Sequence, residues 1–572
     1  MLLINTSSKN STRIFQAFYP IHPPVGIGFI ISYAESQGIK IDYIDQQVES
    51  DVMARVAEHV KKMTKPYIFG FSVLTAGYKD AVELSRKIRI LYPDSRIVWG
   101  GTHPSMGPEE VMENSDVDFV IRGEGEGPMV ELYRAIKEGT DYSAIENLSY
   151  RKDGKVEHNH TDYLIKDLDS MPPFPYHLFA HEKRYDMGFV ISSRGCPYEC
   201  IFCSISFTPG GRRYRYRSSK NIVDDLETIY TRFGTTSAIF LDDNFLVNRK
   251  RIYSLINEIK SRGLHEKMRL VMQARGDGID RAMLQDMFDA GFKVILFGIE
   301  TASEEIMTTV KKGETVREVA EGIAVAKDIG YYVSGTYIFG LPGDTHEERM
   351  SCLDMAKELG LDEVRFNNAV PYPGTAMFHD ARKEGLLNVQ GLYENFIAVS
   401  AITESVFQEV PLAYVPKGCT EDEIKRDLVL CSIAAYFSVM DTFRIVAKNS
   451  SSKWFSWGQS PWEKLKKLPS ALYLGLMLGL KVFRLFYLLF INRDTALPLK
   501  EVLQALFSRQ PSRRILPALA NTRVVKKQNT ESDWHEIEVN RQEIPEDEPM
   551  FKLHGLVETS KSSPSSAGLI SK

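Results

Sequence analysis

The chain has 572 residues, of which 43% are hydrophobic and 25% are charged, and its formal net charge is −5. This is the composition of a soluble globular protein with sizeable cores, and the small net charge gives no reason to expect nucleic acid as a partner. Six cysteines in so long a chain exclude a disulfide framework, and the opening MLLINTSSKN is not a secretory signal, so we expect a cytoplasmic protein.

Short apolar strands alternate with amphipathic helices over residues 1–145. The expected strands are MLLIN, IDYID, YIFGFSVL, RIVWGG and the start of DFVIRGEGEG, and helical stretches such as 78–92 separate them. Strands that alternate with helices form parallel sheets. The pattern predicts a doubly wound α/β domain over residues 1–145. A proline-bearing linker with a small strand pair follows over residues 146–185.

A second series of strands and helices occupies residues 186–400. Six apolar segments end in polar or glycine-rich loops, and helices such as 219–233 and 316–329 separate them. Six such units predict a partial (β/α)6 TIM barrel rather than the full eightfold barrel. Functional side chains are then expected at the carboxyl ends of its strands.

The pattern changes after residue 400. Residues 401–522 are expected to form a helical C-terminal domain that contains an unusually apolar stretch. Residues 523–572 are polar, show no periodicity, and are predicted to be a disordered tail.

Half of the six cysteines lie within CPYECIFC, directly after a predicted strand, as Cys196, Cys200 and Cys203. A structural zinc site uses four ligands, a disulfide would leave one cysteine over, and a redox pair would not need the first. Three thiolates on one loop suit three irons of a [4Fe–4S] cluster, with the fourth iron open. Buried packing is the expected role of Cys352, Cys419 and Cys431.

The spacing C-x-x-x-C-x-x-C, with the aromatic Phe202 before the last cysteine, resembles the signature of the radical SAM enzymes. A zinc or redox cluster is the alternative reading. The resemblance implies that the open iron binds S-adenosylmethionine, and that one electron then yields a 5′-deoxyadenosyl radical. It also implies that Phe202 lies near the adenine.

Further stretches resemble the same family at successive strand ends. FLDDNF carries Asp242, Asp243 and Asn244, which the resemblance places near the amino group of S-adenosylmethionine or the substrate, although capping or solvation is an equal alternative. QARGD offers Gln273 and Arg275, and the arginine is expected either to pair with the cofactor carboxylate or to form a structural salt bridge.

FGIETAS carries Glu300 and Thr301, which are similar to the family's ribose-side motif. As an alternative, Glu300 would stabilise the first turn of the following helix. IFGLPGDT and PYPGT also match the family, and we expect them to be glycine and proline turns that shape the adenosine pocket.

The N-terminal domain resembles the cobalamin-binding domain that precedes many radical SAM barrels. Ser72 and Leu74 form an S-x-L element at one strand end, and Gly100 and Gly101 form the paired glycines at the next. Serine can bind the buried nucleotide tail, and paired glycines let that tail lie close to the backbone. The alternative is a degenerate sheet that binds no corrin.

The third cobalamin element, D-x-H-x-x-G, is missing after the first strand. This absence puts a lower axial histidine in doubt. His22 and His103 are expected to be ordinary loop histidines rather than cobalt ligands.

Residues 468–491 are long enough for a membrane span, but Lys481 and Arg484 lie in their middle. Two central cations are unfavourable in a bilayer core, whereas a helix in the membrane interface could extend them toward the headgroups. An interfacial helix and a buried or oligomeric helix are equal expectations, with a spanning helix a minor one. An interfacial helix would favour a lipid-like substrate.

These resemblances together predict a cobalamin-dependent radical SAM enzyme with a [4Fe–4S] cluster, S-adenosylmethionine and cobalamin as cofactors. The expected reaction is methyl transfer to an unactivated carbon of a hydrophobic substrate, in which methylcobalamin delivers the methyl group and a second S-adenosylmethionine restores it. The expected partners are a small-molecule or lipid-like substrate and an electron donor such as flavodoxin or ferredoxin. A ring-forming radical cyclase and a non-catalytic cluster-binding protein are the alternatives.

Overall fold

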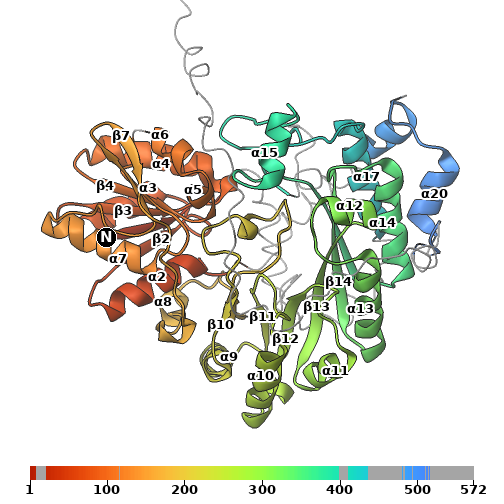
Figure 1. Cartoon of the computed structure of the whole chain (residues 1–572), viewed down its shortest axis with the longest axis horizontal. Coiled ribbons are helices and arrows are strands. Elements are labelled where there is room, and N and C mark those ends of the chain that lie inside the picture. Colours follow the sequence, from red (N-terminus) through yellow and green to blue (C-terminus); the bar gives the residue numbers. More distant parts are fainter. Residues whose placement is uncertain are drawn as a thin grey trace, which may run out of the picture.

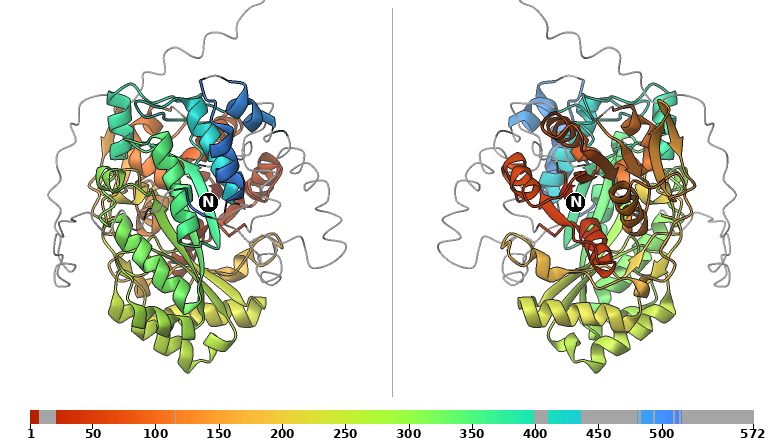
Figure 2. Two further views of the ribbon diagram at one scale, coloured as in Figure 1. Left: turned by 90° about the vertical axis from the view of Figure 1, so that its right-hand side faces the viewer. Right: turned by 90° about the vertical axis from the view of Figure 1, so that its left-hand side faces the viewer.

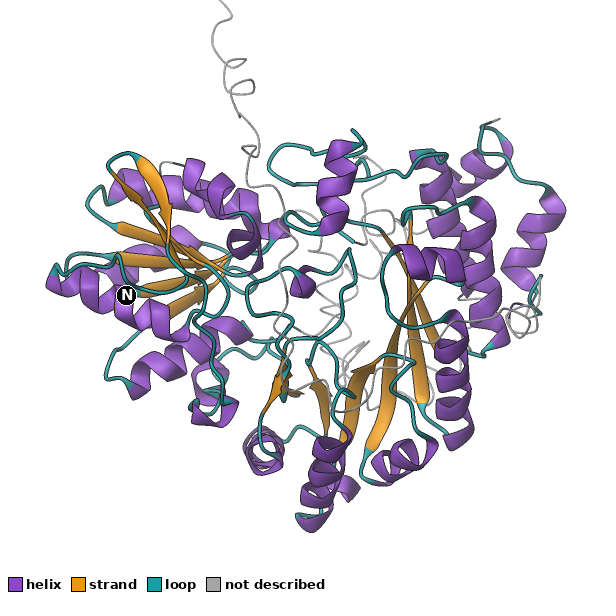
Figure 3. Ribbon diagram, in the orientation of Figure 1, coloured by secondary structure: helices purple, strands orange, loops and turns teal. Residues whose placement is uncertain are grey.

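The computed structural model describes residues 1–7, 21–114, 116–398 and 410–435, together with 480, 483–492, 494–508, 510–512 and 515. Two separate parallel sheets form its framework, one from the N-terminal part of the chain and one from the middle (Figures 1 and 3). Helices surround both sheets, and the loops at the strand ends of the first sheet lie toward the second (Figure 1).

The first sheet has the strand order β2-β1-β3-β4-β5-β6-β7, and its first five strands are parallel. Ser72 at the end of β3 stands in register with Gly100 at the end of β4, so the two predicted cobalamin elements are neighbours at one edge. The parallel strands are β1 (Leu2–Asn5), β2 (Asp42–Asp45), β3 (Ile68–Ser72), β4 (Arg96–Gly100) and β5 (Phe119–Ile121).

Helices cover both faces of this sheet, because alternate side chains of each strand enter two different cores. On β4, for example, Ile97 and Trp99 join one buried cluster, whereas Val98 joins the other. The predicted doubly wound fold is thereby confirmed. The helices of this part are α2 (Val25–Ser36), α3 (Val52–Val60), α4 (Tyr78–Leu91), α5 (Thr102–Met106), α6 (Pro108–Glu113) and α7 (Glu126–Glu138).

The strand pair expected within residues 146–185 forms β6 (Leu148–Lys152) and β7 (Lys155–His158). These strands do not stand apart as a linker element. They pair antiparallel with each other and with β5, and so extend the first sheet. The sequence could not show this, because hydrogen bonding to β5 depends on where the chain returns after α7.

The second sheet has six parallel strands in the order β15-β14-β13-β12-β11-β8 and does not close into a barrel. This confirms the predicted partial (β/α)6 barrel. Its strands are β8 (Phe189–Val190), β11 (Ser237–Phe240), β12 (Arg269–Ala274), β13 (Phe292–Glu300), β14 (Tyr332–Phe339) and β15 (Glu363–Asn368). Its helices are α9 (Ser219–Phe233), α10 (Arg249–Ser261), α11 (Arg281–Asp289), α12 (Glu304–Thr309), α13 (Val316–Ile329), α14 (His346–Glu358) and α15 (Ala376–Lys383).

The C-terminal helices pack against the barrel. Helices α17 (Glu421–Ala434) and α20 (Leu499–Phe507) lie beside each other and beside α14 (Figure 2). Residues 483–490 are also helical, and Leu485 and Leu489 enter the barrel core. Most of the predicted apolar helix 468–491 and all of the predicted tail 523–572 lie outside the described residues. Among the described helices, none is both long and apolar enough to cross a membrane.

Candidate functional site

The three clustered cysteines lie on one compact loop between two short antiparallel strands, β9 (Ser193–Arg194) and β10 (Arg215–Tyr216). The amide of Cys196 donates to the carbonyl of Gly211, which closes the loop at its base. A side chain on Gly211 would meet the carbonyl of Ile205 at 2.0 Å, so only glycine allows this closure. The fold therefore places Cys196, Cys200 and Cys203 on one closed loop.

Cys200 is buried, and Cys196 and Cys203 are partly buried. Burial raises the pKa of Cys200 to about 11 and also raises the pKa values of Cys196 and Cys203. Positive charge from Lys312 and Arg275 opposes this shift at Cys200. Thiols of this kind become thiolates when iron replaces the proton, so the loop fits a bound metal cluster.

The donor set of the cysteine loop fits an iron–sulfur cluster. A structural zinc site uses four ligands around one ion, whereas the loop offers the three thiols of Cys196, Cys200 and Cys203. Three thiolates suit three irons of a [4Fe–4S] cluster, each iron taking one of them.

A buried chain of charges lies beside the cysteine loop. The ammonium of Lys312 is 2.8 Å from Oε1 of Glu300 and 3.7 Å from Oε1 of Glu314. Burial alone would lower the pKa of Lys312, but these two carboxylates outweigh it and raise that pKa. The backbone carbonyl of Lys312 is also 4.0 Å from the sulfur of Cys200. Lys312 and Glu314 were not predicted from the sequence, which gives no sign that KKGET folds back onto the strand end.

Glu300, the predicted ribose-side residue, has an unusual backbone. It adopts a φ of +67°, and the pairing of β13 with β14 shifts register between Gly298 and Glu300. A non-glycine residue in this region is strained and is held there by its surroundings. Here the ion pair with Lys312 holds Glu300 in this conformation and fixes the direction of its carboxylate.

Arg275, predicted at the end of β12, already has protein partners. Its guanidinium donates to Asp277 at 3.0 Å and lies 3.4 Å from the ring centre of Tyr198, a residue of the cysteine loop. Glu314 is 4.0 Å away and also accepts from the amide of Gly276. The structural salt bridge that the sequence left open is therefore formed, and it connects β12 to the cysteine loop.

The three polar residues of the strand end FLDDNF have different surroundings. Asp242 is buried and accepts hydrogen bonds from the amides of Ser192 and Ser193 and from Arg251, so its carboxylate is fully occupied by the protein. Asp243 is exposed and accepts from the amide of Gly195, directly before the first cysteine of the loop. Asn244 is buried. Of the three, Asp243 is the one whose side chain faces the cysteine loop.

The other predicted site residues of the barrel, Phe202, Thr301 and Gln273, have different surroundings. Phe202 is half-buried against a small apolar cluster that includes Ile201 and Val310. Thr301 is buried, and its hydroxyl accepts from the amide of Ser303 just before α12, as a structural cap does. Gln273 is exposed on β12.

The PYPGT turn contacts the first domain, a role that the sequence did not predict. A side chain on Gly374 would meet Cβ of Met106 in α5 at 2.7 Å. The amide of Met377, at the start of α15, donates to the carbonyl of Ile201 in the cysteine loop. The turn therefore joins α5 of the first domain to the cysteine loop.

The carboxyl edge of the first sheet fits a bound nucleotide tail. Leu74 is 58% exposed, which leaves a large apolar side chain uncovered at the end of β3. Among the described residues, the atom that a side chain on Gly100 would meet first is the carbonyl oxygen of Ile121, at the ordinary contact distance of 3.7 Å, so their packing does not require glycine there. In contrast, Gly101 has a φ of +102° and would meet the backbone of Val73 at 2.8 Å. The described residues therefore leave room beside Gly100 that a ligand could take.

The two histidines of this part have different settings. His103 lies in α5 rather than in the expected loop, is fully buried, and packs against Tyr78 and Tyr393. Burial lowers the pKa of His103 to about 3, so the ring is neutral. Nδ1 of His22 is 3.0 Å from the carbonyl oxygen of Asp186, in the segment that leads to β8.

The other cysteines are only partly as expected. Cys352 and Cys431 are buried, the latter 3.9 Å from the sulfur of Met350, as predicted for packing residues. Cys419 is half-buried and polar in its contacts, because its thiol donates to the carbonyl of Asp344 and lies 3.5 Å from Arg349.

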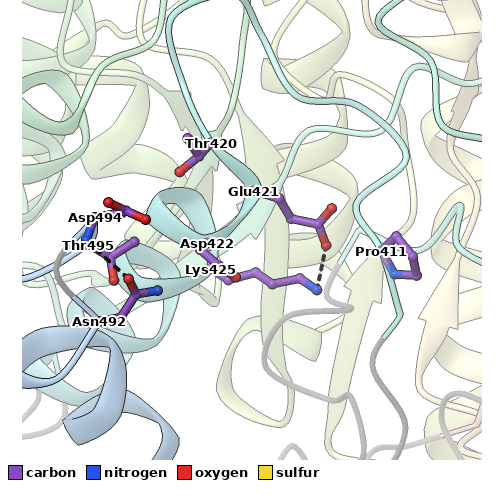
Figure 4. Close-up of a pocket in the computed structure, with 8 residues that line it drawn as sticks. All are labelled: Pro411, Thr420, Glu421, Asp422, Lys425, Asn492, Asp494 and Thr495. Atoms are coloured by element: carbon purple, nitrogen blue, oxygen red, sulfur yellow. Dashed lines mark hydrogen bonds and ion pairs between the residues drawn. The ribbon is translucent and has the colours of Figure 1, made fainter.

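A separate pocket lies at the start of α17 (Figure 4). Lys425 in this pocket pairs with Glu421 at 2.6 Å and donates to the carbonyl of Val410. None of the predicted site residues lines this pocket. Its lining residues are Pro411, Thr420, Glu421, Asp422, Lys425, Asn492, Asp494 and Thr495.

Comparison with known proteins agrees with both resemblances. Residues 190–374 match the radical SAM superfamily, and residues 14–133 match the B12 binding domain. An uncharacterized methyltransferase of Pyrococcus horikoshii is 32% identical over 371 residues, which cover 64% of this chain and 80% of that protein. An anaerobic magnesium-protoporphyrin IX monomethyl ester cyclase of Cereibacter sphaeroides is 24% identical over 63% of this chain and 61% of its own length.

Solved structures share the fold. The cobalamin-dependent S-adenosylmethionine radical enzyme OxsB, with aqua-cobalamin and S-adenosylmethionine bound, aligns with a TM-score of 0.62 at 18% identity over 88% of this chain and 74% of its own. The radical S-adenosylmethionine methyltransferase TsrM from Kitasatospora setae aligns with a TM-score of 0.61 at 16% identity over 84% of this chain and 98% of its own.

The sheet edge beside Gly100, the three-cysteine loop and these matches lead to the same assignment. A [4Fe–4S] cluster, S-adenosylmethionine and cobalamin are the cofactors of this architecture. The chain belongs to the radical SAM enzymes that carry an N-terminal cobalamin (B12)-binding domain.

Proposed function

We propose that this enzyme transfers a methyl group to an unactivated carbon of a hydrophobic or lipid-like substrate. When bound, the cluster with S-adenosylmethionine supplies a 5′-deoxyadenosyl radical, and the cobalamin supplies the methyl group. The observation that carries the proposal is that one chain has both the three-cysteine loop and a sheet edge at Gly100 where the described residues leave room for a ligand. The similarity to methyltransferases of this architecture supports methylation over other radical reactions.

Each predicted residue of the barrel then has a role that its surroundings support. Cys196, Cys200 and Cys203 hold the cluster, with Cys200 on its buried side. Glu300, aimed by Lys312, accepts from the ribose hydroxyls. Asp243, beside the loop, attracts the amino group of S-adenosylmethionine.

Other residues shape or steady these two sites. Phe202 packs near the adenine, and Thr301 steadies the start of α12 beside Glu300. Arg275 holds the cysteine loop through Tyr198, and its pairing with Asp277 makes it a weaker candidate for the cofactor carboxylate. At the first sheet, Ser72, Leu74, Gly100 and Gly101 hold the cobalamin tail.

Anaerobic incubation with methyl-labelled S-adenosylmethionine and a lipid extract tests the reaction. The protein would be reconstituted with iron, sulfide and cobalamin and reduced by a flavodoxin or ferredoxin, the electron donors that we propose. Mass spectrometry is expected to find the labelled methyl group in a lipid product. A product without label would instead identify the ring-forming cyclase, and the absence of 5′-deoxyadenosine would identify a non-catalytic cluster-binding protein.

A lipid-like substrate is supported by the surface of residues 483–507. Leu485 and Leu489 of the helix 483–490 are buried in the barrel core, yet Phe483, Phe486 and Tyr487 are at least half exposed. The barrel core covers only one face of this helix, so its exposed apolar face favours contact with a second apolar surface. This apolar face suits peripheral contact with a membrane, and the sequence supplies cations for anionic headgroups upstream of it, in WEKLKK.

Co-sedimentation with vesicles that contain phosphatidylglycerol tests the membrane contact. Phe486→Ser is expected to weaken binding, whereas Tyr216→Ser removes an aromatic side chain of similar exposure elsewhere and should leave it unchanged. Equal binding by the wild-type protein and Phe486→Ser would rule this contact out.

A further inference from the structure

The loop after β5, residues 122–126, contacts the cysteine loop on both sides. Arg194, two residues before Cys196, donates to Glu124 at 3.0 Å and to Glu126 at 2.7 Å. On the other side, a side chain on Gly123 would meet the carbonyl of Pro209 at 3.1 Å. A loop of the cobalamin-binding domain thus contacts the segment that carries the cysteines at both of its ends.

Glu124 accepts most of the hydrogen bonds in this contact. A second arginine, Arg215 on β10, donates to both oxygens of the same carboxylate at 3.1 Å and 2.9 Å. The amide of Ile165 donates to it at 2.8 Å. Burial would raise the pKa of Glu124, but Arg215 and Arg194 outweigh burial and hold that pKa below its usual value. The carboxylate therefore stays charged, and both strands that frame the cysteine loop are tied to it.

The same loop is tied to the paired glycines on its other side. The amide of Gly123 donates to the hydroxyl of Ser105 at 2.8 Å, and that hydroxyl donates to the carbonyl of Gly101 at 2.7 Å. A short series of hydrogen bonds therefore runs from Gly101, through Ser105 and the 122–126 loop, to Arg194 and the cysteine loop.

Buried ion pairs of this kind fix geometry more than they add stability. Two arginines face two glutamates with little exposure, and forked arginine–carboxylate contacts allow one orientation only. Radical methylation needs such precision, because both cofactors must reach the same substrate carbon.

We propose that Glu124 is a positioning residue that fixes the separation between the cobalamin and the iron–sulfur cluster. This inference rests on the proposed function, since it requires both cofactors. The 122–126 loop then joins the two cofactor sites into one rigid unit, a role that belongs to neither site alone.

Electron paramagnetic resonance on the full-length protein loaded with both cofactors tests this role without any substrate. Cob(II)alamin and the reduced cluster each carry an unpaired electron, and the cluster speeds relaxation of the cobalt signal in a strongly distance-dependent way. The wild-type protein is expected to show a uniform enhancement of relaxation. Glu124→Gln, which keeps the side-chain size but removes the charge, is expected to lose most of this uniform enhancement while it retains wild-type iron and corrin contents.

Asp225→Asn is the matched control, because it breaks a buried arginine–aspartate pair, Arg217–Asp225 at 2.6 Å, that lies within the barrel part alone. This control should keep the wild-type enhancement. If Glu124→Gln does not fold, Arg215→Lys removes the fork but keeps the charge, and the same loss is expected. Wild-type relaxation in a folded Glu124 or Arg215 variant, or an equal loss in Asp225→Asn, would overturn the inference. A wild-type protein that holds no corrin or no cluster would instead contradict the proposed function.

Discussion

Gly100 and Gly101 are neighbours at the end of β4, yet the protein constrains only the second. A side chain on Gly100 would make only an ordinary contact with Ile121 among the described residues, whereas Gly101 has a positive φ and lies against the backbone of Val73. The fold therefore accounts for the second glycine, and we propose that a ligand accounts for the first.

A matched pair of substitutions separates these two roles. Gly100→Ala should fold with near wild-type stability but retain much less corrin after reconstitution, because the added methyl group fills the space of the nucleotide tail. Gly101→Ala should lower the free energy of unfolding by about 1 kcal/mol or more, because alanine disfavours the positive φ at this position. Corrin absorbance and urea unfolding measure the two effects. Full corrin content in Gly100→Ala would contradict the ligand role.

Lys312 is the residue whose removal should disturb the barrel site most. Lys312→Met would leave Glu300 and Glu314 buried without their shared cation, which is expected to lower the free energy of unfolding by about 3 kcal/mol. Lys311→Met, at the exposed neighbour, should change it little. Urea unfolding of the two variants measures the difference, and equal stabilities would show that the buried ammonium is not needed.

At the scale of elements, the C-terminal helices are joined to the barrel by a charged contact. Nδ1 of His346 lies 2.9 Å from Asp427 in α17, and Nε2 lies 2.9 Å from Glu501 in α20. Burial would lower the pKa of His346, but these carboxylates outweigh it and raise that pKa. A histidine with a raised pKa stabilises the folded state at low pH and loses this effect as the pH rises through the raised value.

The attachment of α20 is therefore expected to weaken between about pH 6 and about pH 8.5. Hydrogen exchange of the α20 amides, corrected for the intrinsic pH dependence of exchange, should become faster at the higher pH. His346→Gln should remove this difference between the two conditions. Exchange that stays equally slow in the wild-type protein would contradict the charged state of His346.

The elements themselves were largely predictable from the sequence, but the contacts between them were not. Strands and helices of both sheets follow from apolar periodicity, and α9 and α13 have the predicted bounds. Lys312 was missed because α12 separates it from Glu300 in the sequence. Glu124 was missed because GEGEG reads as an ordinary loop until the fold places Arg194 and Arg215 against it.

At the scale of the whole molecule, the first domain and the barrel share a core. Val370, Phe378, Tyr393 and Phe396, which follow the last barrel strand, are buried together with residues of the first sheet. The hydroxyl of Tyr393 donates to Glu110 in α6 at 2.8 Å. This packing and the 122–126 loop join the cobalamin-binding part to the barrel at two separate places.

Glu110 makes this shared core sensitive to pH. Burial raises its pKa to about 7 from an ordinary value of 4.5. The carboxyl must lose its proton in a buried site as the pH rises between these values, so its contribution to stability falls with rising pH. Glu110→Gln should thus be more stable than the wild-type protein at about pH 8, by at most about 3 kcal/mol, and similar at low pH. Urea unfolding of the two proteins measures this difference, with Glu109→Gln at the exposed neighbour as the control. Equal free energies of unfolding for the wild-type protein and Glu110→Gln at both pH values would contradict it.

We propose that the cysteine loop holds a reducible cluster at which S-adenosylmethionine is cleaved, next to a bound corrin. The yield of 5′-deoxyadenosine from the reconstituted, reduced protein tests this, measured in parallel on the variants Cys200→Ala and Cys419→Ala. The wild-type protein and Cys419→Ala are expected to form 5′-deoxyadenosine, whereas Cys200→Ala should form none and lack the cluster absorbance. Formation of 5′-deoxyadenosine by Cys200→Ala, or its absence from the wild-type reaction, would contradict it.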